Sequence, residues 1–352
     1  MAFKKISVIE FIQHAKNHAV IDVRSPGEYI HAHIPSAYSL PLFTDEERKI
    51  VGTAYKQESR EKAIKHGLEF FGTKMVKMVE QVEKLCAPRN DKTVLVHCWR
   101  GGMRSAAVAW LLDMYGFKVY TLDGGYKAFR QWVLQQFEQD YPFKIIGGYT
   151  GSGKTELLAE MKKSGEKVID LEDLANHKGS AFGGIGQGAQ PSPEMFENKL
   201  AIELMKAGNT STETIWLEDE SQRIGNINIP IEFWKIMRSR PVIFLNIPFE
   251  ERLDNIVKGY GKDDKEKLVN AVIRIKKRLG GLETKAAINF LLEDNLKESF
   301  RVLLSYYDKW YRKGLESRDN WKELVTETNA EKVDAALNAQ LVLALKREEQ
   351  NV

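Results

Sequence analysis

The feature that most constrains the fold is the octapeptide Gly148–Thr155, which matches the pattern G-x-x-x-x-G-K-[ST] in full. An apolar run, Phe143–Ile146, precedes it, and residues 156–163 have the composition of a helix. A strand, a glycine-rich loop and a helix in this order are the context that a phosphate-binding loop (P-loop) requires. The alternative, a chance match in a glycine turn, does not explain this context. The pattern therefore predicts an α/β domain in the second half of the chain.

The residues of this loop have distinct expected roles. Its backbone N–H groups would surround a diphosphate or triphosphate. Lys154 would pair with the phosphate charge, and Thr155 could ligate Mg²⁺. The predicted diphosphate-binding residues are Gly148, Thr150, Gly151, Ser152, Gly153, Lys154 and Thr155.

A second strand, loop and helix pattern surrounds Cys98. The apolar run Thr93–Val96 leads into the loop, and an alanine-rich apolar run at residues 106–112 follows it. A cysteine at the first loop position would face backbone N–H groups and the positive end of a helix, which favours anions and lowers a thiol pKa. The alternative is a buried packing cysteine, which needs no electropositive loop. The sequence predicts Cys98 as a nucleophile in an anion loop comprising Trp99, Arg100, Gly101, Gly102, Met103 and Arg104.

The length of the chain predicts two domains. A chain of 352 residues exceeds a single ordinary core. Strand patterns alternate with helix patterns in both halves, which predicts parallel sheets covered on both faces. We expect one domain over residues 1–136 and a P-loop domain, similar to NTPases or kinases, over residues 137–352. Beyond residue 250 the composition predicts a helical and basic region.

Composition adds weaker constraints. A formal net charge of +3 does not by itself indicate a nucleic-acid binder. Two cysteines argue against a disulfide framework and favour a reducing, cytoplasmic location. The first residues lack a secretory h-region, and no apolar run approaches the roughly 20 residues that span a bilayer. We therefore expect no membrane partner.

Three further segments are candidates for the second domain. One carboxylate among Glu218, Asp219 and Glu220, after a predicted strand, could hold Mg²⁺ through water, and an exposed acidic turn is the alternative. The glycine-rich segment at residues 176–186 could close over a phosphate, or be a surface loop. Candidate diphosphate or base contacts in this region are His177, Lys178, Ser180 and Arg223, and an ordinary surface arginine is the alternative for the last.

Basic and aromatic residues are interleaved near the C-terminus. Such clusters would suit the binding of an RNA backbone and its unstacked bases. The alternative is that they form the solvated face of an amphipathic helix. The residues concerned are Arg274, Lys276, Lys277, Arg278, Tyr306, Tyr307, Lys309, Trp310, Tyr311, Arg312, Lys313 and Arg318.

Residues 1 to about 136 resemble a rhodanese domain. The motifs that carry the resemblance are Ile21–Arg24, Glu28–Tyr29, His33–Pro35, the Cys98 loop and Leu122–Tyr126. Such domains carry sulfur or selenium on the loop cysteine. The spacing His97-Cys98-x5-Arg104 is also that of cysteine-dependent phosphatases, whose loop is one residue longer than in ordinary sulfurtransferases. A longer loop fits a tetrahedral, phosphate-like group.

The whole chain resembles the tRNA 2-selenouridine synthase family. The Cys98 loop, the P-loop, Asp170–Ser180 and Glu218–Gly225 carry this resemblance. It implies a transferase that geranylates the sulfur of wobble 2-thiouridine with geranyl diphosphate and then exchanges the S-geranyl group for selenium from selenophosphate. It also implies a tRNA anticodon stem-loop as partner, a selenophosphate-supplying enzyme as a candidate partner, and no tightly bound cofactor.

The same resemblance suggests roles for individual residues. Cys98 would accept or guide selenium, Arg100 and Arg104 would bind the phosphate portion of selenophosphate, and Lys154 would stabilise the departing diphosphate. A geranyl chain would need an apolar tunnel near the P-loop, for which the candidate lining residues are Phe182, Trp216 and Phe233. Two other functions stay open at this point. They are a P-loop kinase or NTPase regulated by a rhodanese domain, and a cysteine-dependent phosphatase fused to a P-loop domain.

Overall fold

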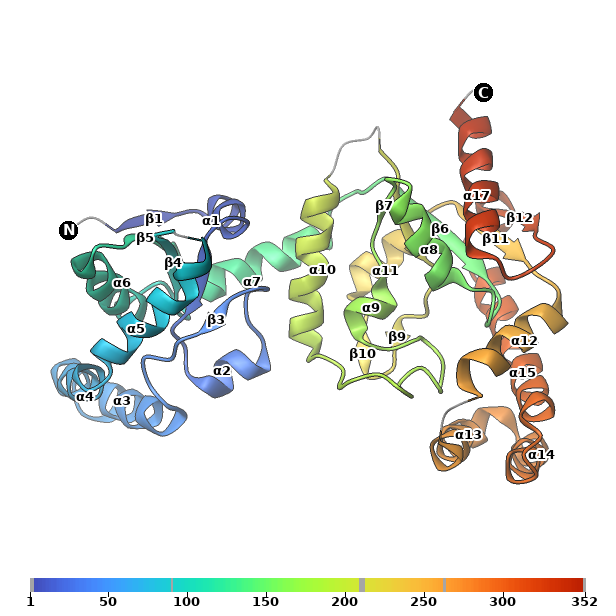
Figure 1. The fold of residues 1–352 in the computed structure, drawn as a ribbon, viewed down its shortest axis with the longest axis horizontal. Helices are drawn as coiled ribbons and strands as arrows, with labels where there is room; N and C mark the ends of the chain where they lie inside the picture. The colour runs from blue at the N-terminus through green and yellow to red at the C-terminus, as the bar shows by residue number, and fades with distance from the viewer. Residues whose placement is uncertain (1–2, 90, 209–212, 262–263, 351–352) are drawn as a thin grey trace. The chain divides into compact units, whose positions relative to one another are not determined.

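The computed structural model describes residues 3–89, 91–208, 213–261 and 264–350 (Figure 1). It divides into two compact units. The N-terminal unit comprises Met1–Gln136 together with Glu197–Ile202, and the C-terminal unit comprises Phe137–Phe196 and Glu203–Val352. No helix within the described ranges is long and apolar enough to cross a membrane.

The N-terminal unit is built on a five-stranded parallel sheet of order β1-β5-β4-β2-β3. Val94, Leu95 and Val96 of the central strand are all fully buried, because helices cover both faces of the sheet. This arrangement confirms the predicted parallel sheet. The strands are β1 (Lys4–Ile6), β2 (Ala19–Asp22), β3 (Tyr38–Ser39), β4 (Thr93–His97) and β5 (Lys118–Leu122).

Two helices of this unit, α1 and α3, begin with a capping box. Ser7 and Thr44 each accept a hydrogen bond from a backbone N–H of the first turn, with a glutamate completing the capping box. The side chains of α5 and α6 form one core with the strands, and this core includes Cys86. The helices are α1 (Val8–Ala15), α2 (Pro26–His31), α3 (Asp45–Gln57), α4 (Arg60–Gly72), α5 (Met75–Cys86), the 3₁₀ turn η1 (Ala87–Arg89), α6 (Met103–Tyr115) and α7 (Gly125–Gln136).

The C-terminal unit contains a second parallel sheet, of order β12-β11-β6-β8-β7. The P-loop follows the central strand β6, so it lies at the carboxyl edge of the sheet between the ends of its neighbours, where α/β folds bind ligands. The strands are β6 (Phe143–Gly148), β7 (Lys167–Val168), β8 (Ile215–Glu218), β11 (Val242–Asn246) and β12 (Val325–Asn329), and β9 (Arg223–Ile224) and β10 (Ile227–Asn228) form a separate antiparallel pair.

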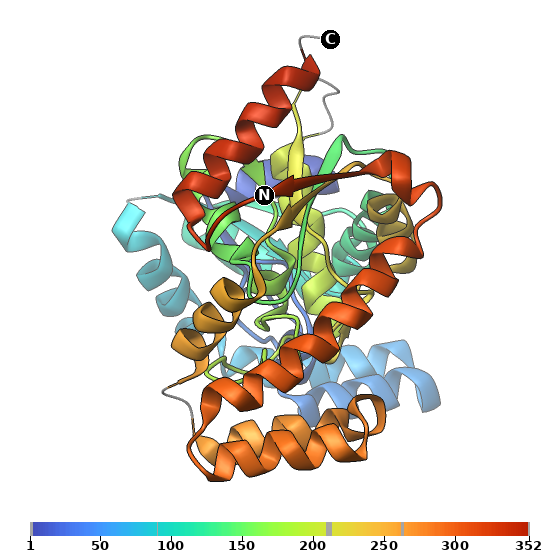
Figure 2. The same cartoon turned by 90° about the vertical axis from the view of Figure 1, so that its right-hand side faces the viewer.

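Two apolar cores support this sheet and its helices. Trp216 and Ile146 pack with residues of α8 and α17, whereas α12–α15 enclose a second core that also receives Phe182. Figure 2 shows the long α15 running along the helical side of the unit. The helices are α8 (Lys154–Lys163), α9 (Leu171–Ala175), α10 (Pro193–Ala207), α11 (Ile231–Arg238), α12 (Phe249–Tyr260), α13 (Lys265–Leu279), α14 (Gly281–Leu292), α15 (Leu296–Glu316), α16 (Trp321–Leu324) and α17 (Ala335–Gln350).

The prediction of an entirely helical region beyond residue 250 is wrong at β12. Val325–Asn329 pairs in parallel with β11 and forms an edge of the sheet. Its sequence, V-T-E-T-N, combines β-branched and polar side chains, as suits an edge strand that is partly exposed. The strand ends beside the P-loop, because Val333, four residues further on, lies against Gly153.

Candidate functional site

Cys98 is the first residue after β4 and precedes α6 by a four-residue loop. Its side chain is 3% exposed, and its Sγ lies 3.2 Å from Oγ of Ser105 in the first turn of α6. The Ser105 hydroxyl donates its proton to the Gly102 carbonyl over 3.1 Å. Because a serine has a single hydroxyl proton, the thiol of Cys98 is the donor of the Cys98–Ser105 hydrogen bond.

The start of α7 fixes the backbone of this loop. The N–H groups of Tyr126 and Lys127 donate to the carbonyl oxygens of Cys98 and Trp99, each over 2.9 Å. In a planar trans peptide the carbonyl and the following N–H point in opposite directions. The N–H groups of Trp99 and Arg100 therefore point away from α7, where an anion bound at Cys98 would meet them.

Two glycines allow the loop and the α7 turn to touch. Gly101 and Gly125 both have positive φ, at 64° and 63°. A Cβ atom on Gly101 would lie 2.6 Å from the Leu122 carbonyl oxygen, and one on Gly125 would lie 2.3 Å from the Gly101 nitrogen. Any side chain at either position would push the two turns apart.

A buried charged network lies beneath the loop. The Arg24 guanidinium forms three hydrogen bonds with Asp22, of 3.0, 3.0 and 2.6 Å, and stacks 3.8 Å above the Tyr126 ring. His97 is fully buried, 3.7 Å from Asp22. Burial lowers the pKa of His97 to about 4, although the Asp22 charge opposes this effect. The imidazole is therefore neutral at pH 7.

The predicted anion-binding arginines have different surroundings. Arg104 donates to Oε2 of Glu28 over 2.9 Å, and Arg48 contacts the same carboxylate. Burial alone would raise the pKa of Glu28, but these arginines outweigh it and hold the pKa below its usual value. Arg100 is exposed, as are Trp99 and Met103 at the outer rim of the loop. The role of Arg104 in binding an anion stays a prediction.

The P-loop has the expected connection from β6 to α8. Lys154 donates from Nζ to the Gly148 carbonyl over 2.9 Å, and the ammonium lies 5.5 Å from the centre of the Tyr311 ring. Gly151, with a φ of 82°, lies against α12, so that a Cβ atom there would be 2.8 Å from the Arg252 carbonyl oxygen. The loop is thus packed against the helices that follow β11.

Side chains from α12 hold the carbonyl groups of the P-loop. Arg252 donates to the Thr150 carbonyl and Asn255 to the Gly151 carbonyl, both over 3.1 Å. Arg252 is 3% exposed and also forms a bidentate ion pair with Asp308 of α15, with distances of 2.9 and 2.7 Å. The sequence predicted neither Arg252 nor Asn255, because they lie about a hundred residues from the loop and belong to no motif.

Helix α15 contacts the start of the P-loop through Tyr311. The Gly148 N–H donates to the Tyr311 hydroxyl over 3.2 Å, and that hydroxyl donates to Asp219 over 2.8 Å. Arg318 pairs with the same carboxylate. Burial, together with the Asp219 charge, raises the pKa of Tyr311 well above its usual value. Asp219, one of the three carboxylates predicted as a Mg²⁺ ligand, is thus bound by Tyr311 of α15 and by Arg318.

The other acidic residues face Thr155. The Thr155 hydroxyl donates to Glu172 over 2.9 Å, and the Glu172 N–H donates to Glu218 over 2.8 Å. Burial and then the charges of neighbouring carboxylates raise the pKa of Glu218 well above its usual value. Burial and the Glu172 charge do the same for Glu220. Because side chains alternate along an extended segment, residues 218 and 220 lie on one side and 219 on the other, which the sequence could have indicated.

The glycine-rich segment lies beside these carboxylates. A Cβ atom on Gly179 would lie 2.5 Å from Oε1 of Glu172 and 2.9 Å from Oε1 of Glu220, and the φ of 67° also favours glycine there. Lys178 lies 5.9 Å from the Tyr260 ring, His177 is half-buried, and the Ser180 hydroxyl accepts from the Phe182 N–H. Arg223, by contrast, is exposed and donates to Gly225 within its own turn.

The three residues predicted to line an apolar tunnel lie in separate apolar groups. Phe182 packs with Tyr260 and Phe300 in the core of α12–α15, and Trp216 belongs to the core under α8 and α17. Phe233 instead contacts Phe137 and Phe143. These three aromatic side chains are fully buried in three separate groups, so they cannot line one tunnel. Their size and apolarity place them in cores rather than in a site.

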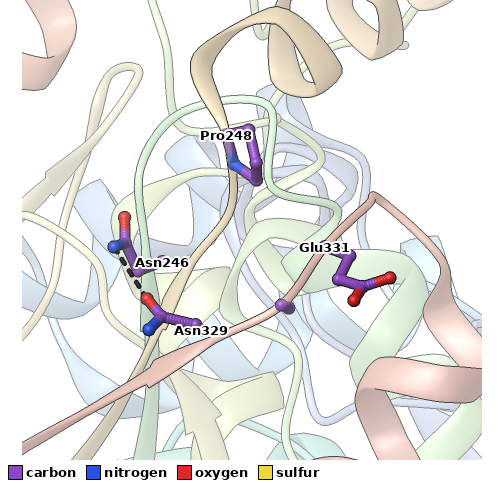
Figure 3. Close-up of a pocket in the computed structure, with 5 residues that line it drawn as sticks. Asn246, Pro248, Asn329 and Glu331 are labelled. Carbon is purple, nitrogen blue, oxygen red and sulfur yellow. Dashed lines mark hydrogen bonds between the residues drawn. The ribbon is translucent and has the colours of Figure 1, made fainter.

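A shallow hollow lies at the carboxyl ends of β11 and β12 (Figure 3). Its volume is about 290 Å³, and the Asn246 side-chain amide donates to that of Asn329 across it over 3.0 Å. The register pairs Leu245, just before Asn246, with Gly148 of the P-loop. The residues that line the hollow are Asn246, Pro248, Asn329, Ala330 and Glu331.

The two loops and their parallel sheets define a protein with a rhodanese-type cysteine loop in its first unit and a P-loop in its second. Family models agree with this class: a rhodanese-like domain matches residues 7–131, and a tRNA 2-selenouridine synthase AAA domain matches residues 141–343. The chain belongs to the tRNA 2-selenouridine synthase family.

Individual relatives with this name align with the chain over most of their length. A tRNA 2-selenouridine synthase from Pseudomonas fluorescens (strain Pf0-1) is 33% identical over 329 residues, which cover 83% of this chain and 87% of the relative. One from Sulfurovum sp. (strain NBC37-1) is 33% identical over 358 residues, with 91% and 94% covered. A crystal structure of an N-terminal domain from Clostridium difficile 630 is 36% identical, covers 37% of this chain and 99% of that domain, and has a TM-score of 0.35.

Proposed function

We propose that this protein replaces sulfur by selenium in 2-thiouridine at the wobble position of tRNA, in two steps. The first step transfers a geranyl group from geranyl diphosphate to the sulfur. The second step exchanges the S-geranyl group for selenium from selenophosphate. The observation that carries the proposal is the presence, in one chain of this family, of a cysteine in a backbone-lined anion loop and of a complete P-loop.

The P-loop supports the first step. In that step the bond between sulfur and the geranyl carbon forms while the carbon–oxygen bond to diphosphate breaks, so negative charge develops on the leaving diphosphate. Positively charged and N–H groups placed at such a leaving group stabilise the transition state. Lys154 donates a hydrogen bond to the Gly148 carbonyl. A bound diphosphate would take the place of this carbonyl as the partner of Lys154. The N–H of Gly151 is directed by the Arg252–Thr150 hydrogen bond.

The residues around Thr155 fit a Mg²⁺ ion, which would neutralise diphosphate charge. Glu218 Oε2 is buried and has no hydrogen-bond partner among the described residues. In the described part of the chain, no three or more His, Cys, Asp or Glu side chains are grouped so that they could hold a metal ion by themselves. This agrees with Mg²⁺ held by one or two protein groups, water and phosphate oxygens. The Thr155 hydroxyl and one of Glu172, Glu218 and Glu220 would supply the protein ligands.

The Cys98 loop supports the second step. S-Geranylation makes the sulfur a better leaving group at C2 of the base. Selenium from selenophosphate then bonds to C2, the C2–S bond breaks, and geranyl thiol leaves. Hydrolysis of the P–Se bond leaves 2-selenouridine and phosphate. Cys98 would guide the selenium without forming a bond to it, while the loop N–H groups, Arg100 and Arg104 would bind the phosphate portion.

A single experiment tests both steps and their order. Purified protein is incubated with an anticodon stem-loop RNA bearing 2-thiouridine and with geranyl diphosphate, then with selenophosphate, and nucleoside mass is followed. We expect a mass gain of one geranyl group, followed by its loss with sulfur exchanged for selenium. An unchanged nucleoside, together with ATP hydrolysis or cleavage of an aryl phosphate, would contradict the proposal and favour an NTPase or a phosphatase.

A further inference from the structure

Helix α13 has an exposed face that is rich in basic residues. From Lys267 to Leu282 the sequence holds five basic residues and no acidic one. Lys267, Arg274, Lys277 and Arg278 are exposed and are separated by seven, three and one residues. At 100° per residue these four lie within an arc of about 100°, beside the arc of the buried residues of the same helix, and they span about 16 Å.

Most charges on this face have no carboxylate partner. Among the described residues, Lys267, Lys277 and Arg278 form no salt bridge. Two surface lysines on other helices of the unit, Lys163 and Lys206, each pair with a glutamate three residues earlier. An unpaired row of cations on one helix face is the electrostatic footprint of a bound polyanion.

Arg274 connects this face to α15. It donates to the Ala181 carbonyl over 2.9 Å, and the Ala181 N–H donates to the Tyr307 hydroxyl of α15 over 3.2 Å. Arg278 is near enough to Tyr306 to oppose the rise that burial causes in the pKa of the Tyr306 phenol. The basic face therefore borders the part of α15 around residues 306 and 307.

The aromatic residues of α15 divide into two sets. Tyr307 and Tyr311 point inward and hold Ala181 and the P-loop. Tyr306 and Trp310, four residues apart, have ring centres 6.3 Å apart, and Trp310 is 46% exposed. Exposed aromatic rings beside cations are platforms on which unpaired RNA bases stack.

We infer that the basic face of α13 and the Tyr306–Trp310 pair form the surface that holds a single-stranded RNA loop. The basic residues would contact the phosphate backbone, and the aromatic pair would stack on a base that is turned out of the loop. An anticodon loop has both features, and in this respect the inference rests on the proposed function. An acidic protein partner would use the cations but would leave Trp310 without a role.

Binding of RNA, rather than catalysis, tests this surface. The probe is the 2-thiouridine anticodon stem-loop RNA, and its affinity for the full chain is measured by fluorescence anisotropy at several KCl concentrations. The test variant is K267E/K277E/R278E. Its matched control is K163E/K206E/K235E, which makes the same charge change at lysines that pair with a nearby glutamate.

The two variants should behave differently. We expect the α13 variant to bind at least about tenfold more weakly, and the slope of log K against log[KCl] to become shallower by about 2, since each lost phosphate contact removes about 0.7. The control should keep the wild-type slope. Both variants should unfold cooperatively and bind inorganic pyrophosphate as the wild type does, which shows that they are folded.

The aromatic pair gives an independent readout. Trp310→Ala should weaken RNA binding about tenfold without changing the salt slope, because stacking releases no counterions. Trp110→Ala, at another exposed tryptophan, is its control and should bind as the wild type does. Equal losses in test and control variants, or no loss in the test variants, would overturn the surface. RNA that fails to bind the wild-type chain would instead overturn the proposed function.

Discussion

The guanidinium of Arg252 donates a hydrogen bond of 3.1 Å to the carbonyl oxygen of Thr150, in the middle of the P-loop. The same guanidinium donates to the Ile247 carbonyl and pairs with Asp308. One buried side chain thus joins the P-loop, the start of α12 and α15. By fixing the Thr150 carbonyl on one side of its peptide, Arg252 fixes the Gly151 N–H on the other.

This geometry predicts that Arg252 is a positioning residue for diphosphate. Arg252→Lys keeps a cation opposite Asp308, but a single ammonium cannot reach all three partners of the guanidinium. We expect binding of inorganic pyrophosphate to weaken about tenfold, the loss of roughly one hydrogen bond of this kind. Isothermal titration calorimetry measures this affinity independently of the chemistry that follows.

A neighbouring arginine provides the control for Arg252→Lys. Arg301 also joins α15 to α12, through Glu250, but it does not contact the loop. Arg301→Lys should therefore leave pyrophosphate affinity unchanged. If both variants lost affinity equally, docking of α15 on α12 would be the cause, and the specific role of the Thr150 contact would be wrong.

Local patterns were sufficient to predict the two loops, whereas long-range contacts were not. The segments from β4 to α6 and from β6 to α8 each encode strand, turn and helix within about twenty residues, so glycine positions and apolar runs identify them. The Arg252–Thr150 contact joins residues 102 positions apart, and only the packing of α12 against the sheet creates it. Periodicity alone also cannot separate Tyr311, which faces the P-loop, from Trp310, which faces solvent.

The second prediction separates the two chemical steps. Cys98→Ala removes the thiol but changes no residue of the P-loop unit, so we expect geranylation at close to the wild-type rate. Selenation should fall about a hundredfold or more, because the residue that positions the selenium for attack is lost. Cys86→Ala is the control, since Cys86 packs in the core beneath α5 and should support both steps. Equal loss of both steps in Cys98→Ala, measured by nucleoside mass, would contradict divided roles.

The third prediction concerns the effect of buried His97 on how the stability of the protein depends on pH. Its pKa is about 4 in the folded chain, below the usual 6.5, so the unfolded chain binds the extra proton between these pH values. Stability is therefore complete above pH 6.5 and decreases as pH falls towards 4, by about 3 kcal/mol from this group. His97→Gln cannot titrate, so the difference in unfolding free energy between wild type and variant should shrink by that amount between pH 7 and 4. Urea unfolding at the two pH values measures it, and parallel pH profiles would show the prediction to be wrong.

The fourth prediction follows from Glu218, whose pKa burial and nearby carboxylates raise well above its usual value. The folded chain then holds a proton that the unfolded chain has released, so stability falls as pH rises above 4.5. Glu218→Gln keeps an acceptor for the Glu172 N–H and removes the charge, and it should raise the melting temperature at pH 8 without metal.

Stabilisation by Mg²⁺ with pyrophosphate should weaken in the same variant, because a carboxylate beside Thr155 is lost. Glu213→Gln, at the exposed residue before β8, should change neither quantity. A variant that melts lower without metal, or keeps its full response to Mg²⁺, would exclude Glu218 from the diphosphate site.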